Sequence, residues 1–151
     1  MIANTNVSTL NSLIATTIDS IDGYEEAAKD ATNQRYATLF RERATERRQV
    51  ADQLKAEVRR LGAEPEDDGS LLAGAHRMFL NLRDTVTGTD DKAVIAEVER
   101  GEDHIKAKFE AAINDEDLDP HCRAVAERCF TSVKQGHDQM SALKHSMEAS
   151  S

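Results

Sequence analysis

The sequence predicts an all-α fold, and three observations support this class. Only seven glycines and two prolines occur among the 151 residues, so long segments run without a helix-breaking residue. These segments are rich in Ala, Leu, Glu, Lys and Arg, which favour helices. Their apolar residues recur at spacings of three and four, which is the period of one helix face. We therefore expect several long amphipathic helices around an aliphatic, alanine-rich core.

The first long helix is predicted from about Ser8 to Ala31. Its apolar face is expected to contain Leu10, Ile14, Thr17, Ile21, Tyr24 and Ala28. The opposite face carries four acidic residues, which the same helical period predicts to face solvent: Asp19, Asp22, Glu26 and Asp30.

The second long helix is predicted from about Asn33 to Leu61, with Gly62 in the position of a C-terminal cap. Its apolar face is expected to contain Tyr36, Phe40, Ala44, Ala51, Leu54, Val58 and Leu61. Because only a few residues join it to the first helix, we expect the two helices to pack antiparallel as a hairpin.

A shorter helix is predicted from Leu71 to Val86, after the polar stretch that ends at Gly69. Ser70 is its expected N-cap, and Gly88 follows its end. At 1.5 Å per residue it spans roughly 25 Å, which is enough to carry the chain back along most of the bundle. It is therefore the expected crossover between two hairpins.

The last two long helices form the second predicted hairpin. The third begins near Thr89 or Asp90 and ends in the polar stretch 114–117. The fourth has a clear start, with Asp119 as N-cap and Pro120 at the first helical position. Cys122 and Cys129 lie on its apolar face, about 10 Å apart along one helix, so we expect two buried thiols and no disulfide between them.

Charge and length exclude several classes of function. The formal net charge of −9 would repel nucleic acid phosphates and anionic lipid headgroups. No stretch approaches the roughly 20 apolar residues that cross a bilayer, and the first eleven residues lack the features of a signal peptide. We expect a single domain over residues 1–151, located in the cytoplasm, with no nucleic acid and no membrane partner.

Two hairpins joined by a crossover are the layout of ferritin-like bundles. Seven short strings strengthen this interpretation: 10–14 (LNSLI), 22–28 (DGYEEAA), 61–65 (LGAEP), 69–72 (GSLL), 87–91 (TGTDD), 99–103 (ERGED) and 136–138 (GHD). In this order and spacing the chain resembles a bacterial family of uncharacterised ferritin-like proteins, catalogued as a domain of unknown function. The resemblance implies an antiparallel four-helix bundle with a short crossover helix between the second and third long helices. It implies no established activity.

A di-iron site in such a bundle takes a Glu from each of two helices and a Glu-x-x-His pair from each of the other two. The sequence contains no Glu-x-x-His. Because carboxylates alone can hold hard cations, Glu25, Glu46 and Glu102 remain candidate ligands for iron or another divalent metal. Glu102 lies inside the apolar face of its helix, whereas Glu25 and Glu46 lie at the edges of theirs.

Arginines on the second helix predict a different interior. Arg47 lies near the centre of the inward face and Arg43 close to it, at the height of Glu102 if the second and third helices run parallel. We therefore expect an Arg43/Arg47–Glu102 network where a metal bundle holds cations. His137 is also predicted to face inward, but nearer to Ile95 than to Glu102, about 10 Å away along the axis. The predicted polar core comprises Arg43, Arg47, Glu102 and His137.

Two functions are compatible with these patterns. The first is a non-enzymatic structural or stress-associated bundle, with no catalytic residue and no cofactor. The alternative is a carboxylate-rich metal protein with di-iron-type oxidase, peroxidase or iron-handling activity. The crossover helix is apolar around more than half of its circumference, which favours a homodimer, and the sequence identifies no other protein partner.

Overall fold

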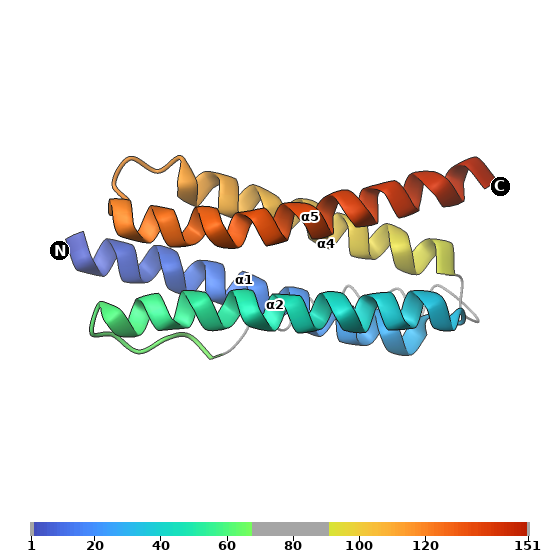
Figure 1. The fold of residues 1–151 in the computed structure, drawn as a ribbon, viewed down its shortest axis with the longest axis horizontal. Helices are drawn as coiled ribbons and strands as arrows, with labels where there is room; N and C mark the ends of the chain where they lie inside the picture. The colour runs from blue at the N-terminus through green and yellow to red at the C-terminus, as the bar shows by residue number, and fades with distance from the viewer. Residues whose placement is uncertain (1, 68–90, 151) are drawn as a thin grey trace.

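The computed structural model describes residues 2–67 and 91–150, and this part of the chain forms four helices without a strand (Figure 1). They are α1 (Ile2–Asp30), α2 (Gln34–Arg60), α4 (Asp91–Ile113) and α5 (Pro120–Ser150). The predicted crossover helix from Leu71 to Val86, with the dimer surface inferred from it, lies outside the described residues. None of the described helices combines the length and apolar character needed to span a membrane.

The helices form a ring in which neighbours run antiparallel. α1 packs against α2 and α4, and α5 packs against α4 and α2. Figure 1 shows that α2 and α4 run in the same direction. These two helices therefore face each other across the diagonal of the bundle, as the height comparison of Arg47 and Glu102 assumed.

The predicted Gly62 cap at the end of α2 and Asp119 cap at the start of α5 are confirmed, and the structure adds an Asn33 cap at the start of α2. The Asn33 side chain accepts a hydrogen bond of 2.9 Å from the Arg35 N–H at the start of α2. Gly62, with φ 81°, ends α2, and its N–H donates to the Arg59 carbonyl while that of Ala63 donates to the Val58 carbonyl. At the start of α5, Asp119 Oδ1 accepts from the His121 N–H at 2.9 Å.

The helix α1 differs from its prediction in two respects. It begins at Ile2 instead of near Ser8, and the buried Asn6 side chain accepts a hydrogen bond of 3.0 Å from the Asp119 N–H. This tertiary contact holds the start of α1, which the spacing of apolar residues in the sequence did not predict. The acidic residues predicted to face solvent are half-buried, because α1 is enclosed over a wider arc in which residues 13–17 are all buried.

The core consists of two hydrophobic clusters. The larger one includes Leu10, Ile14, Val50, Leu54, Val58, Ile105, Phe109, Ala126 and Val133. The other includes Tyr24, Phe40, Ala44, Val94, Ile95, Val98 and Met140. Arg47 lies between Ala44 and Val50 in sequence, and Glu102 lies between Val98 and Ile105. A polar layer therefore crosses the bundle where the two clusters meet.

Candidate functional site

An ion pair across the bundle diagonal forms the centre of the polar layer. Arg47 extends from the middle of α2 and Glu102 from the middle of α4, because the helical period places both on inward faces. Two parallel hydrogen bonds of 2.7 Å join Nη1 to Oε1 and Nη2 to Oε2. Both side chains are 1% exposed. This bidentate geometry is the strongest form of arginine–carboxylate pairing.

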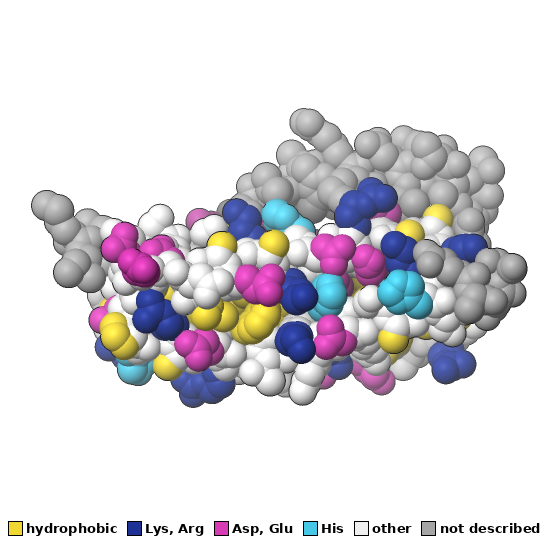
Figure 2. Space-filling view, turned by 90° about the horizontal axis from the view of Figure 1, so that it is seen from above, with side chains coloured by type: hydrophobic (Ala, Val, Ile, Leu, Met, Phe, Trp, Pro, Cys, Tyr) yellow, Lys and Arg dark blue, Asp and Glu magenta, His cyan; other side chains and the backbone are white. Residues whose placement is uncertain are grey.

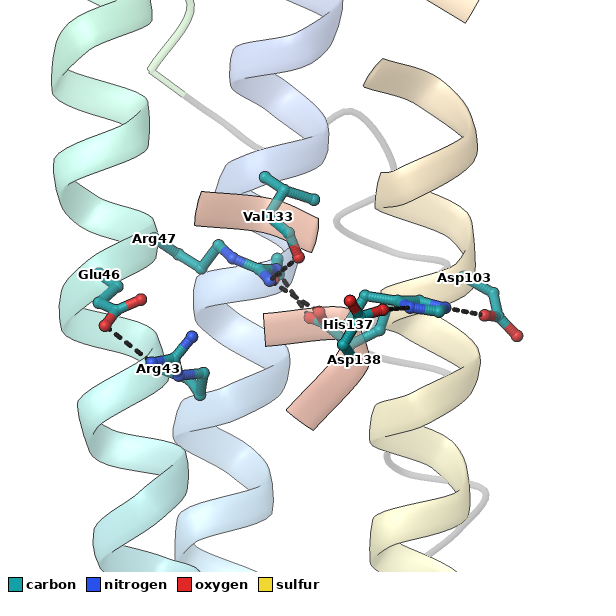
Figure 3. Close-up of polar contacts among 9 residues, drawn as sticks. Arg43, Glu46, Arg47, Asp103, Val133, His137 and Asp138 are labelled. Carbon is teal, nitrogen blue, oxygen red and sulfur yellow. Dashed lines mark hydrogen bonds and ion pairs between the residues drawn. The ribbon is translucent and has the colours of Figure 1, made fainter. Parts of the chain in front are cut away.

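The remaining hydrogens of the Arg47 terminal nitrogens also have acceptors. Nη1 donates to the Ser20 hydroxyl of α1 at 2.8 Å, and Nη2 donates to the Val133 carbonyl of α5 at 3.3 Å (Figure 3). The guanidinium carbon lies 5.7 Å from the centre of the Tyr24 ring. Arg47 on α2 thus contacts the other three described helices. These contacts satisfy a charge that has no access to water.

Burial and pairing set the protonation of this layer. Burial lowers the pKa of Arg47, but the charge and hydrogen bonds of Glu102 outweigh it, so that the pKa is raised. Burial, followed by the negative charge of Glu102, raises the pKa of the Tyr24 hydroxyl well above 10.0. That hydroxyl is buried without a well-aligned hydrogen-bond partner among the described residues. Both shifts favour a charged guanidinium beside a neutral phenol.

Gly136 on α5 makes room for the ion pair. A Cβ at this position would lie 2.4 Å from Arg47 Nη2 and 3.3 Å from Glu102 Oε2. The same Cβ would lie 3.3 Å from Arg43 Nη1. Sequence analysis did not assign this role, although a glycine in the interior of a predicted helix was the available signal.

The other predicted members of the polar core occupy the edge of this layer. Arg43 pairs with Glu46 at 2.7 Å on its own helix, so of the two arginines in the predicted network Arg47 is the one that binds Glu102 directly (Figure 3). The side chain is long enough to reach the nearer carboxylate, one helical turn away.

His137 lies at a different height from the predicted one. Its Nε2 is 2.7 Å from Oδ1 of Asp103, the residue after Glu102, so the prediction that it lies nearer Ile95 is wrong. Figure 1 shows α5 starting beyond the end of α4, because the connecting residues continue along the bundle axis before the chain turns back. This stagger displaces α5 along α4 by more than one helical turn from the position that a tight connection between the two helices would give.

The three candidate metal ligands do not converge. Glu25 pairs with Arg48 at 2.5 Å on the surface, where both side chains are 48% exposed. Glu46 pairs with Arg43, and Glu102 pairs with Arg47. Within residues 2–67 and 91–150 no group of three or more His, Cys, Asp or Glu is arranged to hold a metal ion. Each candidate carboxylate instead holds a different guanidinium.

A second buried carboxylate, which sequence analysis missed, lies where α2 ends beside the start of α5. Glu57 accepts two hydrogen bonds of 2.8 Å from Arg60, and its Oε2 is 2.7 Å from His121 Nδ1. Cys122 Sγ donates to the same oxygen at 3.3 Å. The Arg60 hydrogen bonds, followed by those of His121 and Cys122, lower the pKa of Glu57 from 4.5 to about 2 despite burial.

Both cysteines are buried and free, as predicted. Burial raises the pKa of Cys122 and of Cys129 to about 11 in each case. Because the thiolate is the reactive form of cysteine, neither side chain has the properties of a nucleophile at neutral pH.

The comparisons with known proteins define the class of this bundle. The structure is similar to that of a two-domain protein from Anabaena variabilis containing DJ-1/ThiJ/PfpI-like and ferritin-like domains, with a TM-score of 0.76 and 18% sequence identity. The match covers 96% of this chain and 40% of that protein, so the chain spans well under half of its length. The fold is thus an all-α, ferritin-like four-helix bundle.

The family is also defined. Residues 5–115 match a family model described as a domain of unknown function (DUF2383), and the chain belongs to this family. No curated protein matches the sequence.

The central ion pair generates the first prediction. Glu102→Ala leaves the Arg47 charge buried without its partner, so the free energy of unfolding should fall by about 3–5 kcal/mol. Replacing both residues together, Arg47→Met with Glu102→Leu, should cost less than Glu102→Ala, because no charge is left unpaired. Urea denaturation followed by circular dichroism measures both values. Equal losses in the two proteins would contradict a buried, mutually dependent pair.

Gly136→Ala should destabilise the bundle by about 1–3 kcal/mol, because its Cβ displaces Arg47 Nη2 from two acceptors. Gly101→Ala is the matched control, since Gly101 is also inside a helix but a Cβ there meets nothing within 4 Å. This control should gain up to about 1 kcal/mol from helix propensity. Thermal melting should show a lower melting temperature for Gly136→Ala and a higher one for Gly101→Ala. A higher melting temperature in both variants would show that Arg47 does not require a glycine at position 136.

Glu57 should contribute stability that is lost at acidic pH. Because its pKa is lowered in the folded state, the contribution is complete above 4.5 and is lost as the pH falls through about 2. Glu57→Gln should therefore flatten the dependence of unfolding free energy on pH in this window. The exposed Glu116→Gln is the control and should retain the wild-type slope. Urea titrations between these pH limits provide the measurement.

Proposed function

We propose that this protein is a non-enzymatic ferritin-like bundle in which the Arg47–Glu102 pair takes the place of a metal centre. The observation that carries the proposal is the bidentate contact of these two side chains, both 1% exposed, across the bundle diagonal. A guanidinium held there supplies the positive charge that neutralises the inward carboxylate. It also repels any further cation that approaches Glu102.

The donor set supports this proposal over the metal-binding alternative. A di-iron centre needs several carboxylates and two Glu-x-x-His histidines that share one volume. Here Glu25, Glu46 and Glu102 pair with three different arginines, and two of these carboxylates lie toward the surface. His137 faces Asp103 and Asp138 instead of Glu102. The donors within residues 2–67 and 91–150 therefore support the ion pair over a di-iron centre.

The role that this geometry supports is structural. A buried ion pair makes a small net contribution to stability, because the loss of hydration offsets much of the attraction. Its specific effect is to select one arrangement of the helices, since any slip along the axis would leave both charges unpaired. In our proposal the pair determines how the α1–α2 hairpin sits on the α4–α5 hairpin. The bundle thereby presents one fixed surface to its partners, in a cytoplasm that keeps both thiols reduced.

Metal content and iron oxidation test the proposal. The purified protein should contain no stoichiometric metal by elemental mass spectrometry, and anaerobic loading with Fe(II) followed by air should produce no ferric-oxo absorbance. Glu102→Gln should lower the stability of the metal-free bundle and leave its metal content unchanged, because the amide keeps the shape and loses the charge. The exposed Glu116→Gln serves as the control for both measurements.

About two irons per chain with oxidation, as in a di-iron protein, would overturn the proposal. In that case Glu102→Gln should abolish metal uptake. Circular dichroism of each variant distinguishes this loss from a failure to fold.

A further inference from the structure

Outside the ion pair, a histidine and two carboxylates meet at the seam between α4 and α5. The Nε2 atom of His137 lies 2.7 Å from Oδ1 of Asp103 on α4, and its Nδ1 atom lies 3.2 Å from Oδ1 of Asp138 on its own helix. Figure 3 shows the ring of His137 directed toward Asp103 across this seam. The histidine is 15% exposed, whereas each carboxylate is 59% exposed.

This geometry specifies the charge on the ring. An ionised carboxylate has only acceptor oxygens, so both contacts are hydrogen bonds only when each ring nitrogen carries a proton. A neutral imidazole has one N–H and fills only one of the two contacts. We infer that His137 is a pH-sensitive latch, which joins α4 to α5 while it is an imidazolium and weakens when it loses its proton.

The charges around His137 come from each element that packs against α5. On α4, Asp103 attracts the imidazolium and Lys106 opposes it. On α5, Asp138 is shared with Lys134, whose Nζ lies 3.6 Å from the other carboxylate oxygen. On α2 and inward on α4, Arg43, Glu46, Arg47 and Glu102 form two ion pairs that cancel their own charges.

The balance of these groups favours the charged ring. Burial lowers the pKa of His137, but hydrogen bonds to Asp138 and Asp103 outweigh it and raise the pKa above 6.5. Figure 2 looks onto the face formed by α4 and α5, where histidine side chains lie among acidic and basic ones. The side chain of His137 is 15% exposed, so the ring can exchange its proton with solvent.

The location connects the latch to the polar layer. His137 directly follows Gly136, whose missing side chain leaves space for Arg47. Holding His137 against Asp103 keeps this part of α5 against α4, beside the buried carboxylate of Glu102. When the ring becomes neutral, Asp138 retains Lys134 while the link to α4 loses its charge. The seam beside the ion pair should then open more often.

The direction of the pH effect follows from linkage. Because the pKa of His137 is raised in the folded state, its contribution is fully present below 6.5 and is lost as the pH rises through the folded-state value. Since both carboxylates are exposed, the effect on local opening should be about 2- to 5-fold. This inference is independent of whether the bundle binds metal.

The test combines imidazole titration by NMR with amide hydrogen exchange. In the wild-type protein His137 should titrate above 6.5, and Asp103→Asn should lower that value. Exchange at the amides of residues 133–140, corrected for intrinsic rates, should become about 2- to 5-fold faster as the ring loses its proton. His137→Gln should remove this pH dependence, whereas His104→Gln, at an exposed position on α4, should retain it.

Two outcomes would overturn the latch. One is titration of His137 at or below 6.5, or a value that Asp103→Asn leaves unchanged. The other is the same pH-dependent exchange in His137→Gln and wild type. If His137→Gln does not fold, the comparison rests on Asp103→Asn, which changes only an exposed side chain and should reduce the pH dependence.

Discussion

The desolvated contact between Arg47 and Glu102 is the constraint on which the rest of the bundle depends. Removing water from two full charges costs several kcal/mol per ion, so the pair persists only where its geometry is nearly ideal. Here both oxygens of Glu102 are bonded, and Ser20 and Val133 accept the remaining terminal hydrogens of Arg47. Four helices must therefore hold their positions together, and a small displacement of any one of them leaves a charge unsatisfied.

The hydrophobic core is organised around this requirement. Two hydrophobic clusters lie on either side of the polar layer, and most of their contacts are apolar and non-directional. Apolar contacts are tolerant of sliding, whereas a bidentate ion pair is not. The glycine at position 136 belongs to the same constraint, because the backbone of α5 approaches the guanidinium where a side chain would collide. In the proposed structural role, the clusters supply the driving force for burial and the ion pair selects the alignment of the helices.

The ferritin-like fold does not by itself imply ferritin-like chemistry. Metal-binding bundles of this class gather acidic side chains around a shared interior volume, at the expense of strong mutual repulsion that the cations relieve. In this protein arginines relieve the same repulsion, one carboxylate at a time, and the buried Glu57 follows the same rule with Arg60. Among the described residues, each of these interior carboxylates is consequently paired with an arginine. Such an interior favours a rigid scaffold. Its proposed pH-dependent contact lies between helices, at the histidine between α4 and α5.

The sequence by itself determined the four long helices and the inward positions of Arg47 and Glu102, because helical period, caps and glycine placement are local properties. It also indicated that these two residues lie at one height, which required only that α2 and α4 run parallel. The partner of Arg43, the height of His137 and the cluster around Glu57 were decided by tertiary structure. The height of His137 and the cluster around Glu57 depend on the axial stagger of neighbouring helices, and this stagger follows from the path of the connecting residues. Arg43 instead pairs with a carboxylate one turn away on its own helix. A helical wheel describes direction around an axis and contains no information about position along it.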